Sequence, residues 1–398
     1  MTIATILIII QILLLTLTSL AVLYIAVFAL AGLFYREKPM NKARLQRKMA
    51  VLIPGYKEDE VIVDVAKEAL KQSYAHANYD VIVIADSFNE ETILKLKQLD
   101  IKLIEVRFDK STKSKALNKA MSQLPDVYDV AVVLDADNVM EYDFLEKINL
   151  AFERDIIAVQ AHRAAKNMNN GLAILDAASE EINNHIFRKG HRVLGLSSAI
   201  IGSGMAFKYN YFKQMMSGVN AIGGFDKEIE LKMLSEGLKI EYLNNAWVYD
   251  EKIQKADAFT NQRRRWLSAQ FYYFRKDIIK ATMQLIIKGN VDYFDKAIQF
   301  IQPPRILLVG ATGLQLIIFA AVNYFFALDI RYTLAWLIVT VLCMMALLIS
   351  VPGALYSVKT LRALTELPKG MLLMLGSLLK IKGANKQFLH TKHGTNDK

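Results

Sequence analysis

Two aspartates directly follow an apolar run in the first half of the chain. The run covers residues 130–134, and the aspartates are Asp135 and Asp137. The run predicts a buried strand, and open α/β sheets bind ligands at the carboxyl ends of their strands. Alternate side chains of an extended segment face the same side, so both carboxylates can reach one ligand. Such a pair suits Mg²⁺ or Mn²⁺ held together with phosphates. The alternative is a turn in which Asp137 or Asn138 caps a helix.

Predicted strands and helices alternate in this part of the chain. The strands fall at 49–54, 81–85, 102–106 and 130–134, and the helices at 58–72, 90–99 and 114–124. This alternation predicts an α/β fold with a mostly parallel sheet. Tyr56 and Glu58 follow the first strand, and Asp86 follows the second. Because parallel strands end at one edge, we expect these side chains near the aspartate pair, where they would bind a nucleotide.

Candidate catalytic groups lie further along the chain. Glu228 stands in the first turn of a predicted helix, where it is a candidate general base for an attacking hydroxyl. Arg265 is a candidate for bidentate contacts to phosphate oxygens, and Asp137 is the likelier metal ligand of its pair. Together these groups describe displacement of a nucleoside diphosphate from a sugar, with a metal neutralising the leaving phosphate. Gly-x-Gly-x-x-Gly and Walker-type loops are absent, which disfavours dinucleotide oxidoreductases and P-loop ATPases.

The apolar residues are concentrated in a few long stretches. The chain has 398 residues, of which 53% are hydrophobic, and its mean hydropathy is +0.22. Uncharged stretches at 1–35, 306–328 and 332–358 each exceed the roughly 20 residues that a helix needs to cross a bilayer. Basic residues flank the first and third stretches, which places the central domain on the cytoplasmic side. The net charge of +10 is therefore assigned to flanks facing anionic lipid, and no nucleic acid partner is expected.

These features predict a multi-pass protein of the cell membrane with five parts. They are an N-terminal transmembrane helix at 1–35, a cytoplasmic catalytic domain at 45–280, an interfacial helix region at 281–305, two transmembrane helices within 306–358, and a cytoplasmic tail with an amphipathic segment at 359–398.

Five short motifs in the catalytic domain resemble those of glycosyltransferase family 2. They fall at 53–58 (Ile-Pro-Gly-Tyr-Lys-Glu), 82–87 (Ile-Val-Ile-Ala-Asp-Ser), 113–118 (Lys-Ser-Lys-Ala-Leu-Asn), 135–137 (Asp-Ala-Asp) and 262–266 (Gln-Arg-Arg-Arg-Trp). Within that family, the chain resembles the membrane-embedded synthases of cellulose, hyaluronan and poly-N-acetylglucosamine. The last motif is the most discriminating of the five.

The resemblance implies a GT-A type fold and a role for each motif. Asp86 would recognise a uracil base, and Asp135 would contact the sugar or nucleotide beside the metal ligand Asp137. Lys115, in a motif that looks shortened and lacks the family's glycine, is assigned to substrate binding. Gln262, Arg265 and Trp266 would lie near the acceptor and the donor diphosphate.

One departure from the family pattern concerns the catalytic acid. Lys227-Glu228 stands where the family usually has Glu-Asp, so the family's catalytic aspartate falls on Glu228 by motif position. Asp226 and Glu230 are the substitutes. Glutamate keeps the carboxylate but reaches one methylene further than aspartate does.

The resemblance implies an inverting, metal-dependent enzyme that uses Mg²⁺ or Mn²⁺ at the membrane. It would transfer a sugar from a nucleotide sugar, most often UDP-linked, to a growing polysaccharide or a lipid-linked acceptor. Membrane lipids, and either further copies of the chain or synthase partner subunits, are the other expected partners. Two alternatives stay open: a transferase that adds one sugar to a membrane lipid, and a non-catalytic subunit of a synthase complex.

Overall fold

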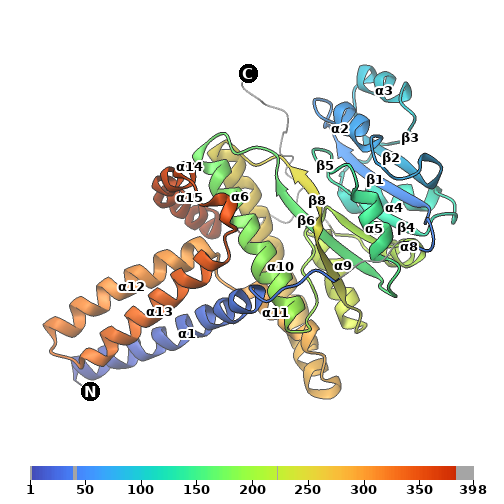
Figure 1. The fold of residues 1–398 in the computed structure, drawn as a ribbon. Coiled ribbons are helices and arrows are strands. Elements are labelled where there is room, and N and C mark those ends of the chain that lie inside the picture. The colour runs from blue at the N-terminus through green and yellow to red at the C-terminus, as the bar shows by residue number, and fades with distance from the viewer. Residues whose placement is uncertain (1, 39–42, 222, 382–398) are drawn as a thin grey trace.

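The computed structural model describes residues 2–38, 43–221 and 223–381 (Figure 1). Residues 382–398 of the predicted tail lie outside the described residues. The chain forms an α/β domain, and a bundle of long helices extends away from that domain.

One mixed sheet forms the centre of the α/β domain. Its described strands are β1 (Met49–Tyr56), β2 (Tyr79–Asp86), β3 (Lys102–Val106), β4 (Val130–Val133), β5 (Val139–Met140), β6 (Ala158–Ala165), β7 (Met205–Lys208) and β8 (Ile240–Asp250). They are arranged in the order β3-β2-β1-β4-β7-β6-β8-β5. The first four of this order are mutually parallel, as are β6 and β8, whereas β7 is antiparallel to both of its neighbours. The predicted α/β fold with a mostly parallel sheet is confirmed.

Helices cover both faces of this sheet. One face carries α2 (Ile62–Ala69), α3 (Glu90–Lys97) and α5 (Phe144–Ala151), and the other carries α4 (Lys113–Gln123), α8 (Tyr209–Ser217) and α9 (Phe225–Ser235). Because strand side chains alternate between faces, β1 contributes Val51 and Ile53 to the first core and Ala50 and Leu52 to the second. A strand buried on both faces must be apolar throughout, which explains its unbroken apolar sequence.

Three helices in the described part of the chain are long and apolar enough to cross a membrane. They are α1 (Ile3–Gly32), α12 (Arg305–Phe325) and α13 (Ile330–Ile349), and they lie side by side in Figure 1. The helix α13 ends at Ile349, before the uncharged stretch does, because Pro352 disfavours a helical continuation. Their shared core includes Val22, Ile25 and Cys343.

Further helices connect the bundle with the sheet. They are α6 (Gly171–Asn183), the π-helix η2 (Asn184–Gly190), α7 (His191–Val193), α10 (Ala256–Lys288), α11 (Val291–Ile301), α14 (Val358–Ala363) and α15 (Leu367–Leu379), with short 3₁₀ turns η1 (His76–Asn78), η3 (Gly353–Leu355) and η4 (Leu364–Glu366). The helix α10 runs unbroken across the domain boundary expected at 280–281, until Gly289 ends it with a left-handed φ of 65°. The helix α11, which lies in the region expected to be interfacial, buries Tyr293 and Phe300 in a core shared with α9 and α10.

Candidate functional site

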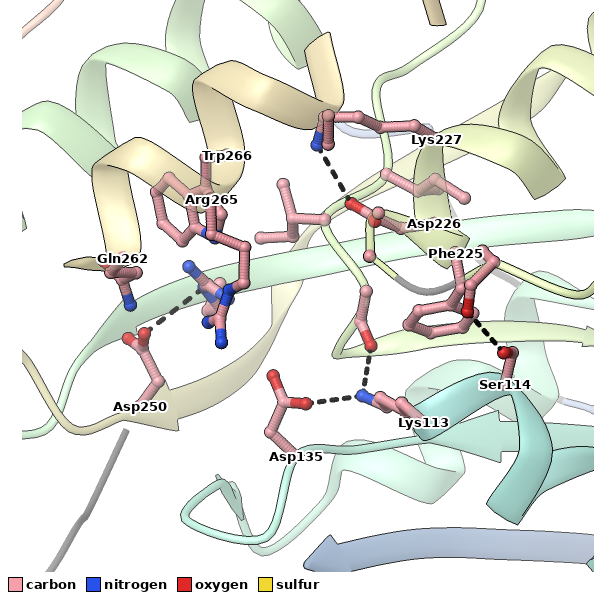
Figure 2. A pocket seen from close by; sticks show the side chains of 18 of the residues that line it. Lys113, Ser114, Asp135, Phe225, Asp226, Lys227, Asp250, Gln262, Arg265 and Trp266 are labelled. Carbon is pink, nitrogen blue, oxygen red and sulfur yellow. Dashed lines mark hydrogen bonds and ion pairs between the residues drawn. The ribbon is translucent and has the colours of Figure 1, made fainter. Parts of the chain in front are cut away.

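A cleft of about 400 Å³ opens at the carboxyl ends of β1, β2 and β4. Its walls continue along α4, the N-terminus of α9 and the first half of α10, and reach α6, the π-helix and α11. Figure 2 shows the labelled side chains of α4, α9 and α10 converging on the cleft from different sides. The cleft therefore extends from the sheet edge to the elements that contact α1 and α12, two of the three candidate membrane-spanning helices.

The Asp-x-Asp segment lies in this cleft, immediately after β4. Asp135 accepts a 2.5 Å hydrogen bond from Lys113 Nζ, which also donates to the Gly202 carbonyl at 2.7 Å (Figure 2). The carboxylate of Asp137 accepts from the Glu251 backbone N–H at 3.1 Å and from Asn138 Nδ2 at 3.2 Å. Both aspartates thus face the cleft from fixed positions, as expected for a shared ligand.

A glycine turn before β7 holds this segment in place. Ser203 Oγ accepts from the Asp135 N–H at 2.9 Å and donates to Asn138 Oδ1. Gly202 adopts a φ of +82°, and a Cβ there would lie 3.4 Å from the Phe225 ring and 3.6 Å from Asp226 Cβ. The backbone conformation of the turn therefore favours glycine at this position, whereas a Cβ there would make only ordinary contacts with α9.

The substrate-binding residues predicted at the strand tips also line the cleft. Tyr56, Glu58 and Asp86 all do so, from the ends of β1 and β2. Burial raises the pKa of the Asp86 carboxyl, which accepts a 2.9 Å hydrogen bond from Ser87 Oγ. Lys57 and Ser87, at the two strand tips, have φ values of 54° and 59°, which is costly for residues other than glycine.

The two lysines of the third motif take different positions. Lys113 lines the cleft and contacts Asp135, whereas Lys115 lies outside the cleft lining and donates to the Lys110 carbonyl at 3.0 Å. On a helix, two positions two residues apart point about 200° apart, so only one of these lysines can face the sheet edge. The sequence contained this information, because Lys113 stands three residues before Ala116-Leu117, as the lysine of that motif does.

The candidate base Glu228 and its two substitutes take different positions on α9. Glu228 is absent from the cleft lining, and its Oε2 accepts from the Tyr273 hydroxyl at 3.2 Å. Asp226 and Glu230 line the cleft instead. These two residues are four apart on α9 and share a face, whereas position 228 falls on another side of the helix. The helical phase of α9 thus places the two substitutes, Asp226 and Glu230, on the cleft side of the helix.

The discriminating motif at 262–266 contributes three residues to the cleft lining. Gln262, Arg265 and Trp266 stand at positions i, i+3 and i+4 of α10 and therefore share one face (Figure 2). Burial lowers the pKa of Arg265, and the nearby charges of Asp135 and Asp226 oppose this effect. The guanidinium is thus held close to the two carboxylate-bearing segments.

Four buried charged residues of the cleft lining, Arg163, Glu180, Arg188 and Asp250, were missed by sequence reasoning. Glu180 lies between two guanidinium groups, 3.1 Å from Arg163 and 3.2 Å from Arg188. Asp250 lies 3.4 Å from Arg163, and burial raises its pKa against the lowering effect of that arginine. No short motif marks these residues, since β6, α6, the π-helix and β8 each supply one of them.

The donor set suits a divalent cation shared with a phosphate ligand. Among the described residues, no group of three or more His, Cys, Asp or Glu side chains could hold a metal ion alone. Asp137, with Asp135 beside it, supplies carboxylate oxygens for a partial coordination shell. Magnesium-like cations are commonly bound in this way, by one or two carboxylates plus substrate phosphates and water. The residues therefore fit a metal that binds with a nucleotide diphosphate.

The chain resembles known proteins in sequence and in fold. The sequence model of the family described as "Glycosyltransferase like family 2" matches residues 46–269, which is more than half of the chain. No curated protein matches the sequence. Among solved structures, the mannosyltransferase PcManGT from Pyrobaculum calidifontis, in complex with GDP-Man and Mn²⁺, is 16% identical with a TM-score of 0.50. The match covers 85% of this chain and 96% of that one.

Two further structural matches have lower TM-scores. TarS of S. aureus is 15% identical with a TM-score of 0.39, over 72% of this chain and 54% of its own. Glucosyl-3-phosphoglycerate synthase from Mycobacterium tuberculosis, bound to Mn²⁺ and UDP, is 13% identical with a TM-score of 0.35, over 54% of this chain and 75% of its own. The GT-A fold predicted for the α/β domain is confirmed by the family match and by PcManGT.

Proposed function

Because the chain belongs to glycosyltransferase family 2, we propose that it is an inverting, metal-dependent transferase that uses a nucleotide sugar at the cytoplasmic face of a membrane. One observation carries this proposal: the Asp-x-Asp segment, Asp226 and the 262–266 motif face a single cleft although they are far apart in sequence. A donor diphosphate bound beside Asp135 and Asp137 would lie within the same cleft as the guanidinium of Arg265.

Each of three cleft residues would have a separate role in the reaction. A bound Mg²⁺ or Mn²⁺, held by Asp137, would neutralise charge on the departing diphosphate. Arg265 would bind diphosphate oxygens, and its planar guanidinium suits two parallel hydrogen bonds. Asp226 would take the proton of the acceptor hydroxyl as its oxygen bonds the sugar C1 and the bond from C1 to the diphosphate breaks. Attack from the side opposite the leaving group inverts the sugar.

The donor is proposed to be a UDP-sugar. Asp86 is 2% exposed and stands at the tip of β2, where its carboxylate would accept a hydrogen bond from the N–H of the base. Tyr56, at the tip of β1, would lie against the nucleoside. Guanine offers N–H donors as well, so a panel of donors must include GDP-sugars.

The acceptor is proposed to be linked to a membrane lipid. The far end of the cleft is lined by Phe187 and Gln299, on elements that pack next to α1. A membrane-borne acceptor would approach from that side. A growing polysaccharide is the second candidate, and the length of the product separates it from a single added sugar. The scaffold alternative rests on Lys227 replacing the family's acid, and the presence of Asp226 in the cleft weakens it.

Release of nucleoside diphosphate from a panel of UDP- and GDP-sugars, by membranes that contain the protein, tests the proposal. We expect release from one donor with Mg²⁺ or Mn²⁺ and loss of release in Asp137→Ala and Asp226→Asn. The exposed Asp64→Asn on α2 is the matched control, since its side chain is 83% exposed. Absence of release from every donor, by folded protein in native lipid with a lipid extract as acceptor, would favour the scaffold alternative.

A further inference from the structure

A buried ion pair joins α9 to α11 at the membrane-side end of the cleft. Lys296 Nζ lies 2.7 Å from Glu230 Oε1, and the two side chains are 4% and 2% exposed. Both residues line the cleft. Removing two charges from water is costly, so a buried pair is weak evidence of a role in stability. Because the pair lies in the wall of the cleft, it suggests a role in positioning the helix α9.

The pair belongs to a longer chain of hydrogen bonds. Lys296 Nζ donates to Gln299 Oε1 at 2.5 Å, and Gln299 Nε2 donates to Asp295 at 2.8 Å. The hydroxyl of Tyr24, on the membrane helix α1, donates to the same Asp295 carboxylate at 2.7 Å. An unbroken series of contacts therefore leads from α1 to Glu230 in the cleft.

The helix α1 is closely seated where this series begins. The ring of Phe28 stacks on His191 with centroids 3.7 Å apart, and His191 Nε2 lies 3.2 Å from Asp295. A side chain at Gly190 would meet the backbone of Phe28 at once, so the π-helix and α1 touch there. A shift of α1 would thus move Asp295 and the residues bonded to it.

At its other end, the series reaches the helix that carries the proposed base. Glu230 stands one turn after Asp226 on the same face of α9. We propose that Lys296 and Glu230 are positioning residues, which hold α9 so that Asp226 faces the acceptor and which make this orientation depend on the seating of α1. The inference rests on the proposed function for the role of Asp226. The coupling between α1 and α9 does not depend on that function.

Steady-state kinetics in lipid nanodiscs tests the catalytic part. Lys296→Met should lower kcat about 100-fold, as a misplacement of about 1 Å does, and leave the donor KM within about twofold. Lys296→Arg keeps the charge and should restore most of kcat. Tyr24→Phe removes one neutral donor and should lower kcat several-fold. Tyr293→Phe is the matched control on α11, because its hydroxyl bonds Asp277 of α10 and lies outside the cleft lining.

Hydrogen exchange of the α9 amides in the same nanodiscs tests the structural part. We expect faster exchange over Phe225–Ser235 in Lys296→Met and Tyr24→Phe, and wild-type exchange in Tyr293→Phe. Unchanged α9 exchange in the first two variants would overturn the coupling, as would an equal loss of kcat in Lys296→Met and Lys296→Arg. If the wild type turns over no donor, the proposed function fails, and the exchange result still decides whether α1 and α9 are coupled.

Discussion

The two ends of the cleft use charge in different ways. At the sheet edge, Asp135 and Asp137 present carboxylates whose protein contacts are one lysine and a few N–H donors. At the membrane side, Glu180 lies between two arginines and Glu230 is paired with Lys296. The first arrangement leaves carboxylate oxygens available to a cation and its phosphate ligand. The second satisfies each of these charges within the protein, so it serves to fix the cleft walls.

The largest effect that this contrast predicts is on catalysis at the sheet edge. Asp137→Ala should lower kcat/KM by about 10³-fold, because the metal supplies several kcal/mol of charge stabilisation. The melting temperature should stay within a few degrees of the wild type, since the described part of the chain gives the Asp137 side chain two hydrogen bonds to lose. Nucleotide release and differential scanning fluorimetry on the same sample measure both. A large drop in the melting temperature of Asp137→Ala would show that the sheet-edge aspartates also stabilise the fold, as the buried ion pairs at the other end of the cleft do.

The complementary change lies at the membrane side. Glu180→Ala leaves Arg163 and Arg188 without their shared counter-charge, and breaking a buried pair costs about 3–5 kcal/mol. We expect a lower melting temperature in detergent before any loss of donor binding. Glu181→Ala, the neighbouring acid that contacts His162, is the control for removing one carboxylate from α6. Unchanged stability in Glu180→Ala would contradict a structural role for this group.

A third test compares two carboxylates of one helix. Asp226→Asn should lower kcat by about 10²-fold or more, which is the usual contribution of a general base. Glu228→Gln keeps a partner for Tyr273 and should remain within about fivefold of the wild type, because Glu228 lies outside the cleft lining. The reverse order of effects would restore Glu228 as the base and would require α9 to rotate when substrates bind.

The sequence predicted the sheet edge better than the membrane side for a physical reason. Acids at strand tips follow apolar strands directly, so a local pattern places Asp86 and Asp135 in the same region. Arg163, Glu180 and Arg188 come together only through tertiary packing, and no local pattern announces them. The family resemblance pointed to α9 but could not give the helical phase, which determines whether Asp226 or Glu228 faces the cleft.

The ends of the helices could also not be predicted from local patterns alone. Long uncharged stretches predicted the spanning helices, yet the end of α13 at Ile349 and the unbroken course of α10 depend on where proline and glycine stand. The amphipathic pattern of α11 suggested a membrane surface. Its apolar side packs against α9 and α10. An amphipathic pattern shows that one side of a helix is covered, but it does not show which surface covers it.

A smaller effect separates the two lysines of α4. Lys113→Met removes a charge-assisted bond to Asp135 and should raise the donor KM about tenfold. Lys115→Met removes only a bond to the Lys110 carbonyl and should leave the donor KM within about twofold. Isothermal titration with the nucleoside diphosphate and Mn²⁺ measures both variants. Equal effects would show that Lys115 reaches the ligand after all.

The smallest effect concerns the pH dependence of donor binding at Asp86. Burial raises the pKa of this carboxyl, so on acidification it takes up its proton before an exposed aspartate does. The protonated acid no longer accepts a hydrogen bond from the base N–H as a carboxylate does. The donor KM should therefore rise roughly fivefold as the pH falls through this raised pKa, and it should be lowest above it. In Asp86→Asn the side chain does not titrate, so its KM should be higher at neutral pH and nearly flat over this range. An equally steep profile in Asp86→Asn would assign the pH dependence to the donor phosphates or to another carboxylate of the sheet edge.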